Sequence, residues 1–191
     1  MRIDRPTLPL CDVHGNFLPG CTSRPAKRLA TMMWHLAHRG EAARLAEVLS
    51  AAAREESIDW GHPAASNGLG ASPLLVASLL GHRHCVEVLL DARMPGTPID
   101  LTDTFGNSPL TAAVARGRTS CVRLLLQAGA DPNHRNAHGL SVMEVAVDHG
   151  RAECASLLIQ NGAVPPPHDE KPRKPERPFK GGMLQWERGA A

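Results

Sequence analysis

The chain has 191 residues, of which 42% are hydrophobic and only 3% aromatic, and its 21 basic side chains nearly balance 19 acidic ones. This charge balance favours neither nucleic acid nor a membrane surface as partner, and no apolar window reaches the roughly 18 residues of a membrane helix. The five cysteines form no CxxC pair, which excludes a zinc module and a disulfide framework from the expectations. We expect one helical domain with appendages, intracellular, in the cytoplasm, the nucleus or both.

Residues 1–25 contain four prolines and two glycines and show little periodicity, so we expect an extended N-terminal arm. Within it, CDVHGN places Asp12 and His14 in a motif that resembles the opening of calcineurin-like metallophosphoesterases. The fragment GHRH, which contains His82 and His84, resembles the closing motif of that family. The intervening motifs GDxxDR and GNHD or GNHE are absent, and two fragments supply too few ligands for a two-metal centre.

Three later stretches of the chain repeat one another. They are GASPLLVASLLGHRHCVEVLL from Gly70, GNSPLTAAVARGRTSCVRLLL from Gly106 and GLSVMEVAVDHGRAECASLLI from Gly139. Their opening glycines lie 36 and then 33 residues apart. A partial copy, TMMWHLAHRGEAARLAEVL, precedes them from Thr31. Such internal repetition is typical of stacked repeat proteins.

Each repeat predicts a pair of short antiparallel helices. Ser72 and Ser108 are placed to cap a first helix whose first turn contains a proline, which needs no backbone N–H there. Gly81 and its equivalents can end that helix with a positive φ, and the apolar runs that follow predict the second helix. The three cysteines that lie four residues after these glycines, Cys85, Cys121 and Cys154, are predicted to be buried core thiols.

The 33-residue period, the Ser-Pro-Leu starts, the mid-repeat glycines and QAGADPN (Gln127–Asn133) resemble ankyrin repeats, over about Ala26 to Ala163. The resemblance implies an all-α solenoid of stacked helix–turn–helix units joined by extended turns. The expected repeats span about 26–66, 67–102, 103–135 and 136–163, the first being an atypical cap. We expect Trp34, in the first helix of this cap, or Trp60, in its extended loop, to seal the N-terminal end of the stack. Asp12-x-x-Gly15-Asn16 has the same form as Asp103-x-x-Gly106-Asn107, so CDVHGN is better interpreted as a turn than as a metal motif.

In this family, partners are usually gripped by the protruding turns and by the exposed ends of the first helices. Carried over to this sequence, the resemblance implies partner-binding residues Arg39, Leu69, Leu79, Leu80, Thr104, Phe105, Asn107, Arg116, His138 and His149. The apolar members would form one exposed patch. The alternative places Leu79 and Leu80 beneath the loop DARMPGTPID or against the N-terminal arm.

Residues 164–191 are rich in proline and charge, and we expect a disordered basic tail. Near its end Met183, Leu184 and Trp186 form an apolar island. The island is either a linear motif that orders on a partner or a segment that docks back onto the repeats.

We therefore expect non-catalytic protein–protein recognition, as an adaptor or as a subunit of a larger assembly. No metal, cofactor, small-molecule substrate or nucleic acid is expected. Two alternatives stay open: a degenerate metal-dependent phosphoesterase using Asp12 and His14, and an ankyrin-type inhibitor or regulator of a partner enzyme.

Overall fold

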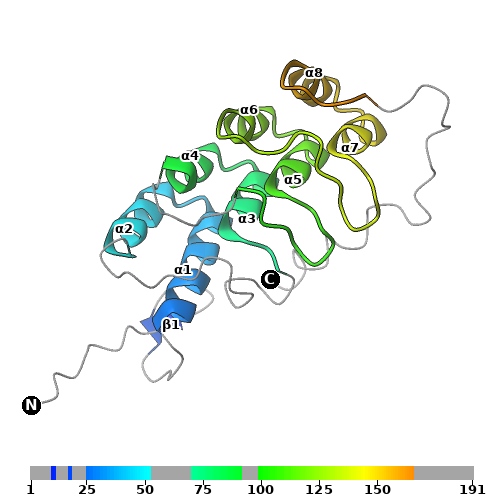
Figure 1. The fold of residues 1–191 in the computed structure, drawn as a ribbon. Helices are drawn as coiled ribbons and strands as arrows, with labels where there is room; N and C mark the ends of the chain where they lie inside the picture. The colour runs from blue at the N-terminus through cyan, green and yellow to red at the C-terminus, as the bar shows by residue number, and fades with distance from the viewer. Residues whose placement is uncertain (1–9, 12–16, 19–24, 53–69, 92–98, 166–191) are drawn as a thin grey trace, which may run out of the picture.

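The structure is a computed structural model that describes residues 10–11, 17–18, 25–52, 70–91 and 99–165, with side chains described within 31–50, 70–91 and 99–165. Its helices are α1 (Pro25–Arg39), α2 (Ala42–Ala52), α3 (Pro73–Leu80), α4 (Arg83–Asp91), α5 (Pro109–Ala115), α6 (Thr119–Gln127), α7 (Val142–Asp148) and α8 (Ala152–Gln160). The odd-numbered helices form one row and the even-numbered helices a second row (Figure 1). The predicted all-α solenoid is confirmed.

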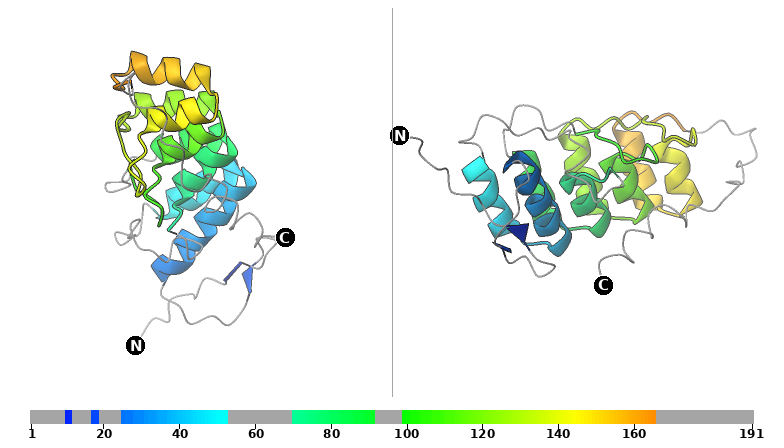
Figure 2. Two further views of the ribbon diagram at one scale, coloured as in Figure 1. Left: turned by 90° about the vertical axis from the view of Figure 1, so that its right-hand side faces the viewer. Right: turned by 90° about the horizontal axis from the view of Figure 1, so that it is seen from below.

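The helix pairs stack in single file. Figure 2 shows them following one another in chain order from α1 to α8 in both of its views. In the first row α3 packs between α1 and α5, and α5 packs on α7; in the second row α4 packs between α2 and α6, and α6 packs on α8. One continuous hydrophobic core runs through these contacts, from Met33 to Ala163. Each pair therefore buries its apolar surface mainly against its neighbours, as in other repeat proteins.

The predicted caps delimit the first helices. The Ser72 side chain accepts a hydrogen bond from the Leu75 N–H at 3.2 Å, and Ser108 does the same for Thr111. Proline occupies the first turn in both α3 and α5. In α7 the proline is absent, and a capping box takes its place.

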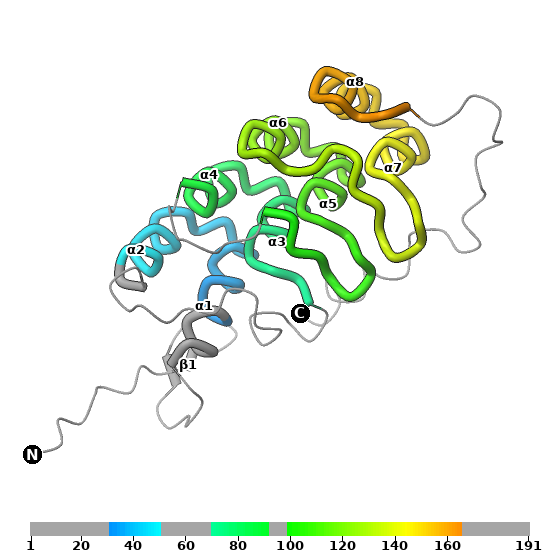
Figure 3. Tube along the Cα trace, in the orientation of Figure 1, coloured from blue at the N-terminus to red at the C-terminus, as the bar shows by residue number. Residues whose placement is uncertain are grey.

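The extended turns before α5 and α7 project from the same edge of the stack (Figure 3). Each is a short hairpin: the Asp103 N–H donates to the Asn107 carbonyl at 3.1 Å, and the Asn136 N–H donates to the Leu140 carbonyl at 3.0 Å. The turns thus form an edge of the molecule to which neighbouring repeats contribute equivalent residues.

The N-terminal arm contains one feature that the sequence did not predict. Strand β1 (Leu10–Cys11) pairs antiparallel with β2 (Phe17–Leu18), with Leu10 opposite Leu18, and β1 contacts α1. Two-residue strands carry too little alternation to be recognised from sequence. Asp12 and His14 lie outside the described residues, so the interpretation of CDVHGN as a turn remains a prediction.

Candidate protein-binding surface

The first turn is held by the carboxylate of Asp103. Its Oδ1 accepts hydrogen bonds from the backbone N–H groups of Phe105 at 2.9 Å and Asn107 at 2.8 Å. Its Oδ2 accepts a third bond, from the Asn107 side chain at 3.2 Å. Because the carboxylate satisfies three donors at once, the backbone at the tip of this turn has a defined shape.

The second turn repeats this arrangement with an amide. Asn136 Oδ1 accepts from the N–H groups of His138 at 3.0 Å and Leu140 at 3.1 Å. The remaining donor of Asn136 is Nδ2, which reaches back to Asn107 Oδ1 at 3.3 Å. An aspartate at position 136 could not donate this bond, so the amide couples the two turns.

Backbone contacts join the two turns as well. The Ala137 N–H donates to the Phe105 carbonyl at 3.0 Å, and His134 Nε2 donates to the Gly106 carbonyl at 2.8 Å. These bonds hold the tips of the two turns together. The close approach requires a glycine, because a Cβ built on Gly106 would lie 2.5 Å from the Ala137 nitrogen. The two turns therefore behave as one preformed unit.

Several side chains are presented along this edge and at the C-terminal ends of the first helices. Thr104, Ala137 and His138 are exposed on the turns, while Phe105 is partly exposed. Leu80, Arg116 and His149 are partly exposed at the ends of α3, α5 and α7, and the Arg39 side chain at the end of α1 is 28% exposed. We call the six members from the three full repeats, Leu80, Thr104, Phe105, Arg116, His138 and His149, the turn surface.

Two of the predicted contact residues are not on the surface. Leu79 is 1% exposed and belongs to the core, because α3 is packed between two neighbouring helices. Asn107 is 3% exposed, because its side chain is used within and between the turns. The prediction that these two side chains contact a partner directly is therefore wrong. Trp60, Leu69, Met183, Leu184 and Trp186 lie outside the described residues, and their roles remain predictions.

The described members of the metal hypothesis have structural partners. His82 Nε2 donates to the His38 carbonyl at 3.1 Å, and His84 contacts Glu87 at 3.0 Å. Hydrogen bonds from Arg83 and His84 hold the pKa of Glu87 below its usual value. Across the parts of the chain that the structure describes, no three His, Cys, Asp or Glu side chains come together as a metal site.

His82 also belongs to a series that sequence reasoning missed. The residue after each mid-repeat glycine reaches back over the glycine of the preceding repeat: His82 over Gly40, Arg118 over Gly81 and Arg151 over Gly117. Arg118 Nε also lies 3.5 Å from the Leu79 carbonyl. A signal was present, because a basic or imidazole side chain follows the glycine in all three full repeats.

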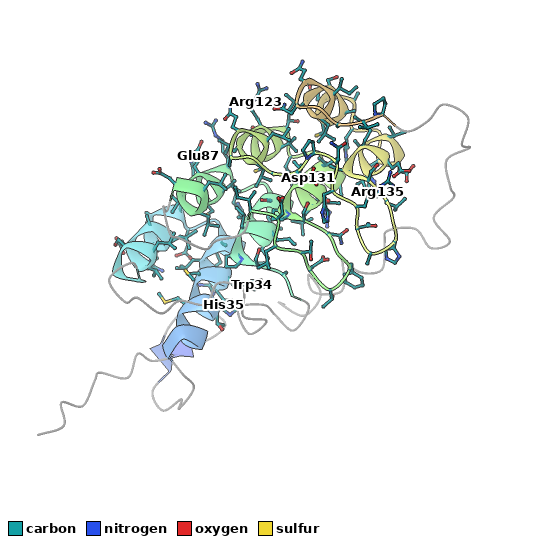
Figure 4. All side chains as sticks on the ribbon, in the orientation of Figure 1. Trp34, His35, Glu87, Arg123, Asp131 and Arg135 are labelled. Carbon is teal, nitrogen blue, oxygen red and sulfur yellow. The ribbon has the colours of Figure 1, made fainter. Side chains whose placement is uncertain are left out.

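Arg135 is a second residue that was missed, and the structure places it at the base of the second turn (Figure 4). Its guanidinium donates to the Gly139 carbonyl at 2.7 Å and lies 3.4 Å from Glu144. The side chain is 63% exposed, so it can contact a partner while it braces the turn. No pattern in the sequence distinguishes it from other surface arginines.

The three repeat cysteines are confirmed as buried thiols, each 1% exposed. Burial raises the pKa of Cys85 and Cys154, and it raises the pKa of Cys121 to about 11. Since the thiolate is the reactive form, these groups act as small apolar side chains and not as nucleophiles.

Trp34 lies in α1, as predicted, and is 7% exposed within the core. Its ring stacks on His38 and meets His35 edge to face, with centroids 5.3 Å apart in both pairs; Figure 4 marks Trp34 and His35. Burial, with the nearby charges of Arg39 and His38, lowers the pKa of His35 below its ordinary value of 6.5. This end of the stack therefore favours a neutral imidazole.

None of the helices in the described ranges is long and apolar enough to cross a lipid bilayer. In comparisons with known proteins, no curated protein matches the chain. The family model of ankyrin repeats, three copies, matches residues 74–169, just over half of the 191 residues. This match runs from the second residue of α3 through α8 and includes both of the coupled turns. The chain therefore belongs to the ankyrin repeat family.

Proposed function

We propose that the protein is an adaptor, or a subunit of a larger assembly, that captures a protein partner on its turn surface. Ankyrin repeats are in general protein–protein interaction modules and are typically non-catalytic. The adaptor role and the contact residues belong to the proposal, which names no particular partner. The alternatives of a phosphoesterase and of an inhibitor are favoured by no contact among the described residues.

The observation that carries the proposal is the coupling of the two turns. The bonds from Ala137 to Phe105 and from Asn136 to Asn107 fix the tips before any partner arrives. A surface that is already ordered loses little conformational entropy on binding, so more of the contact energy appears as affinity. The coupled turns carry the partly exposed aromatic side chain of Phe105 and the exposed polar side chains of Thr104 and His138. Aromatic side chains of this kind often dominate binding energy at protein interfaces.

The test is partner capture by the full chain with substitutions on the turn surface. The variant would combine Phe105→Ser with His138→Glu, both on the tips and outside the core. A hot-spot loss of about 2 kcal/mol lowers affinity by about thirtyfold, so we expect specifically retained proteins to be lost. Quantitative mass spectrometry of proteins retained from cell extract gives the measurement.

The matched control is Arg123→Glu on α6. Arg123 is exposed and projects from the second row of helices, away from the turns (Figure 4). This substitution changes the charge at least as strongly as His138→Glu but leaves the turn surface intact. Circular dichroism should show all variants folded. If folded turn variants retain the same proteins as the wild type, or if Arg123→Glu loses them equally, the turn surface is not the binding site.

A further inference from the structure

The last repeat leaves apolar side chains uncovered at positions that are buried one repeat earlier. Val147 on α7 is 57% exposed, whereas its equivalent Val114 on α5 is fully buried. Ile159 on α8 is 57% exposed, whereas its equivalent Leu126 on α6 is only 8% exposed. Val164, just after α8, is 69% exposed. Val147 and Ile159 thus lie on the side on which a following repeat would pack, whereas the position equivalent to Val164 is the exposed Asp131. We call Val147, Ile159 and the adjoining Val164 the open face.

The glycines support the same conclusion from the backbone. A Cβ built on Gly106 or Gly117 would meet atoms of the following repeat, at 2.5 Å from Ala137 and 3.0 Å from Arg151 respectively. The equivalent glycines of the last repeat are Gly139 and Gly150. In the part of the chain that the structure describes, nothing lies within 4 Å of a Cβ built on either.

The sequence beyond α8 cannot form another repeat of the same kind. Asp103 and Asn136 begin the two turns, and 33 residues after Asn136 the chain again has an acidic turn residue, Asp169. Three residues later the repeats have Gly106 and Gly139, with φ of +73° and +76°, but the tail has Pro172. Proline holds φ near −65°, so this turn cannot be repeated and a further repeat of the same kind cannot cover the open face.

The chain leaves the stack beside the open face. Asn133 fixes this exit: its Oδ1 accepts from the Val164 N–H at 2.9 Å, and its Nδ2 donates to the Gly162 carbonyl at 3.1 Å. The apolar island of the tail begins at Met183, which follows Pro165 by 18 residues. At about 3.1 Å per residue, the value for proline-rich linkers, 18 residues reach at most about 55 Å, which is long enough for the island to meet the face from which the chain departs.

We propose that Met183, Leu184 and Trp186 of this chain's own tail dock on the open face. Three exposed aliphatic side chains are far less than the roughly 800 Å² per partner that a stable dimer buries, but they suit a short segment. The tether makes the contact intramolecular, which favours a contact too weak to hold a separate molecule.

The test is nuclear magnetic resonance of the isotope-labelled full chain. In the wild type, the indole N–H signal of Trp186 should differ from its position in the urea-unfolded chain. Ile159→Lys should move it to the unfolded position, and Val164→Lys, which lies outside the helices, should do the same. In the reciprocal direction, Trp186→Ser should shift the backbone amide signals of α8.

The matched control is Gln160→Lys, which adds the same charge at the neighbouring exposed position of α8 and should leave the Trp186 signal unchanged. The proposal would be overturned if the wild-type indole signal were already at the unfolded position. It would also be overturned if the signal stayed unchanged in both lysine variants. A signal that changes across a dilution series would overturn it as well, because the open face would then be covered by a second copy of the chain.

Discussion

At the scale of single residues, the glycines of this stack serve two separate purposes: they adopt a positive φ, and they allow the next turn to approach closely. Gly106 has a φ of +73°, which disfavours a side chain by itself, and it also lies against the backbone of Ala137 in the next turn. Gly139 has nearly the same φ, +76°, but no neighbour within 4 Å among the described residues. The pair therefore separates backbone strain from the contact between repeats.

Alanine at these two positions should lower stability by different amounts. Gly139→Ala is expected to lower the free energy of unfolding by about 1–2 kcal/mol, through left-handed strain alone. Gly106→Ala should cost about 1–3 kcal/mol more, because the new methyl group must displace the Ala137 backbone. Urea denaturation followed by circular dichroism measures both. Equal losses would mean that the turns can separate at no cost.

The neutral imidazole of His35 should make stability depend on pH. Its folded-state pKa is held below 6.5 by burial, then by Arg39 and His38, so the unfolded chain binds this proton more readily. The resulting stability is complete above about pH 6.5 and is lost as the pH falls through that value toward the folded-state pKa. The wild type should thus lose more stability than His35→Gln between about pH 7.5 and pH 5.5. Parallel pH profiles of the two proteins, from urea denaturation, would contradict this assignment.

At the scale of helices, local chemistry decides where each element begins. Ser141 caps α7 by accepting from the Glu144 N–H at 3.2 Å, and the Glu144 carboxylate accepts from the Ser141 N–H at 2.7 Å. This reciprocal box replaces the serine–proline start of α3 and α5. The first helix of the last repeat thus begins at the equivalent position but is capped in a different way.

Removal of this cap should destabilise the last repeat. Ser141→Ala is expected to lower the free energy of unfolding by about 1 kcal/mol, because the Glu144 N–H loses its acceptor. Ser156→Ala is the control: this exposed hydroxyl donates to the Ala152 carbonyl within α8, and its loss should change stability by less than about 0.5 kcal/mol. Thermal unfolding monitored by circular dichroism distinguishes them. If both variants melt together, the cap contributes nothing measurable.

Features with a local cause were predictable from the sequence. Serine caps, first-turn prolines and positive-φ glycines act within a few residues of their own position, so their spacing predicts the helix pairs. The burial of Leu79 was not predictable in this way. Seven of the eight residues of α3 are buried, so its sequence PLLVASLL has no polar face to show which leucine points outward.

The burial of a polar residue in the turns was likewise not predictable from the local sequence. Asn107 looks like an exposed turn residue, but its side chain bonds to Asp103 in its own turn and to Asn136 in the next. The second partner lies 29 positions further along the chain. Such a contact depends on how two repeats are placed side by side, and no local pattern encodes that. The positions of Thr104, Phe105 and His138 at the turns followed from the repeat itself.

At the scale of the whole molecule, each row of helices is a chain of nearest-neighbour contacts. Stability in such a stack is approximately the sum of the repeats and of the interfaces between neighbours. An interior repeat contributes to two interfaces, whereas α7 and α8 adjoin only one described pair. The same core substitution should therefore destabilise more of the stack in an interior repeat than in the last repeat.

Two core substitutions test this difference. Leu110 on α5 and Leu158 on α8 are both fully buried, and alanine at either should cost about 2–5 kcal/mol locally. Leu158→Ala should accelerate amide hydrogen exchange mainly in α7 and α8. Leu110→Ala should accelerate it in α3 through α8, since it weakens contacts on both sides. Uniform acceleration by both variants would indicate a single cooperative unit in place of coupled repeats.

Each contact in which a side chain covers the mid-repeat glycine of the preceding repeat is a joint between two repeats. These joints affect how repeats can be added to or removed from the chain. Arg118 covers Gly81 and Arg151 covers Gly117, so two successive joints are built from the same pair of residue types. Suppose that a gene segment encoding residues 106–138 is copied in frame after itself. Each copy then contains a mid-repeat glycine, which the arginine of the following repeat covers, and an arginine, which covers the glycine of the preceding repeat. Duplication or deletion of this unit would therefore preserve the joint without any compensating substitution. The Gly40 joint lacks this interchangeability, because it uses His82 and not an arginine.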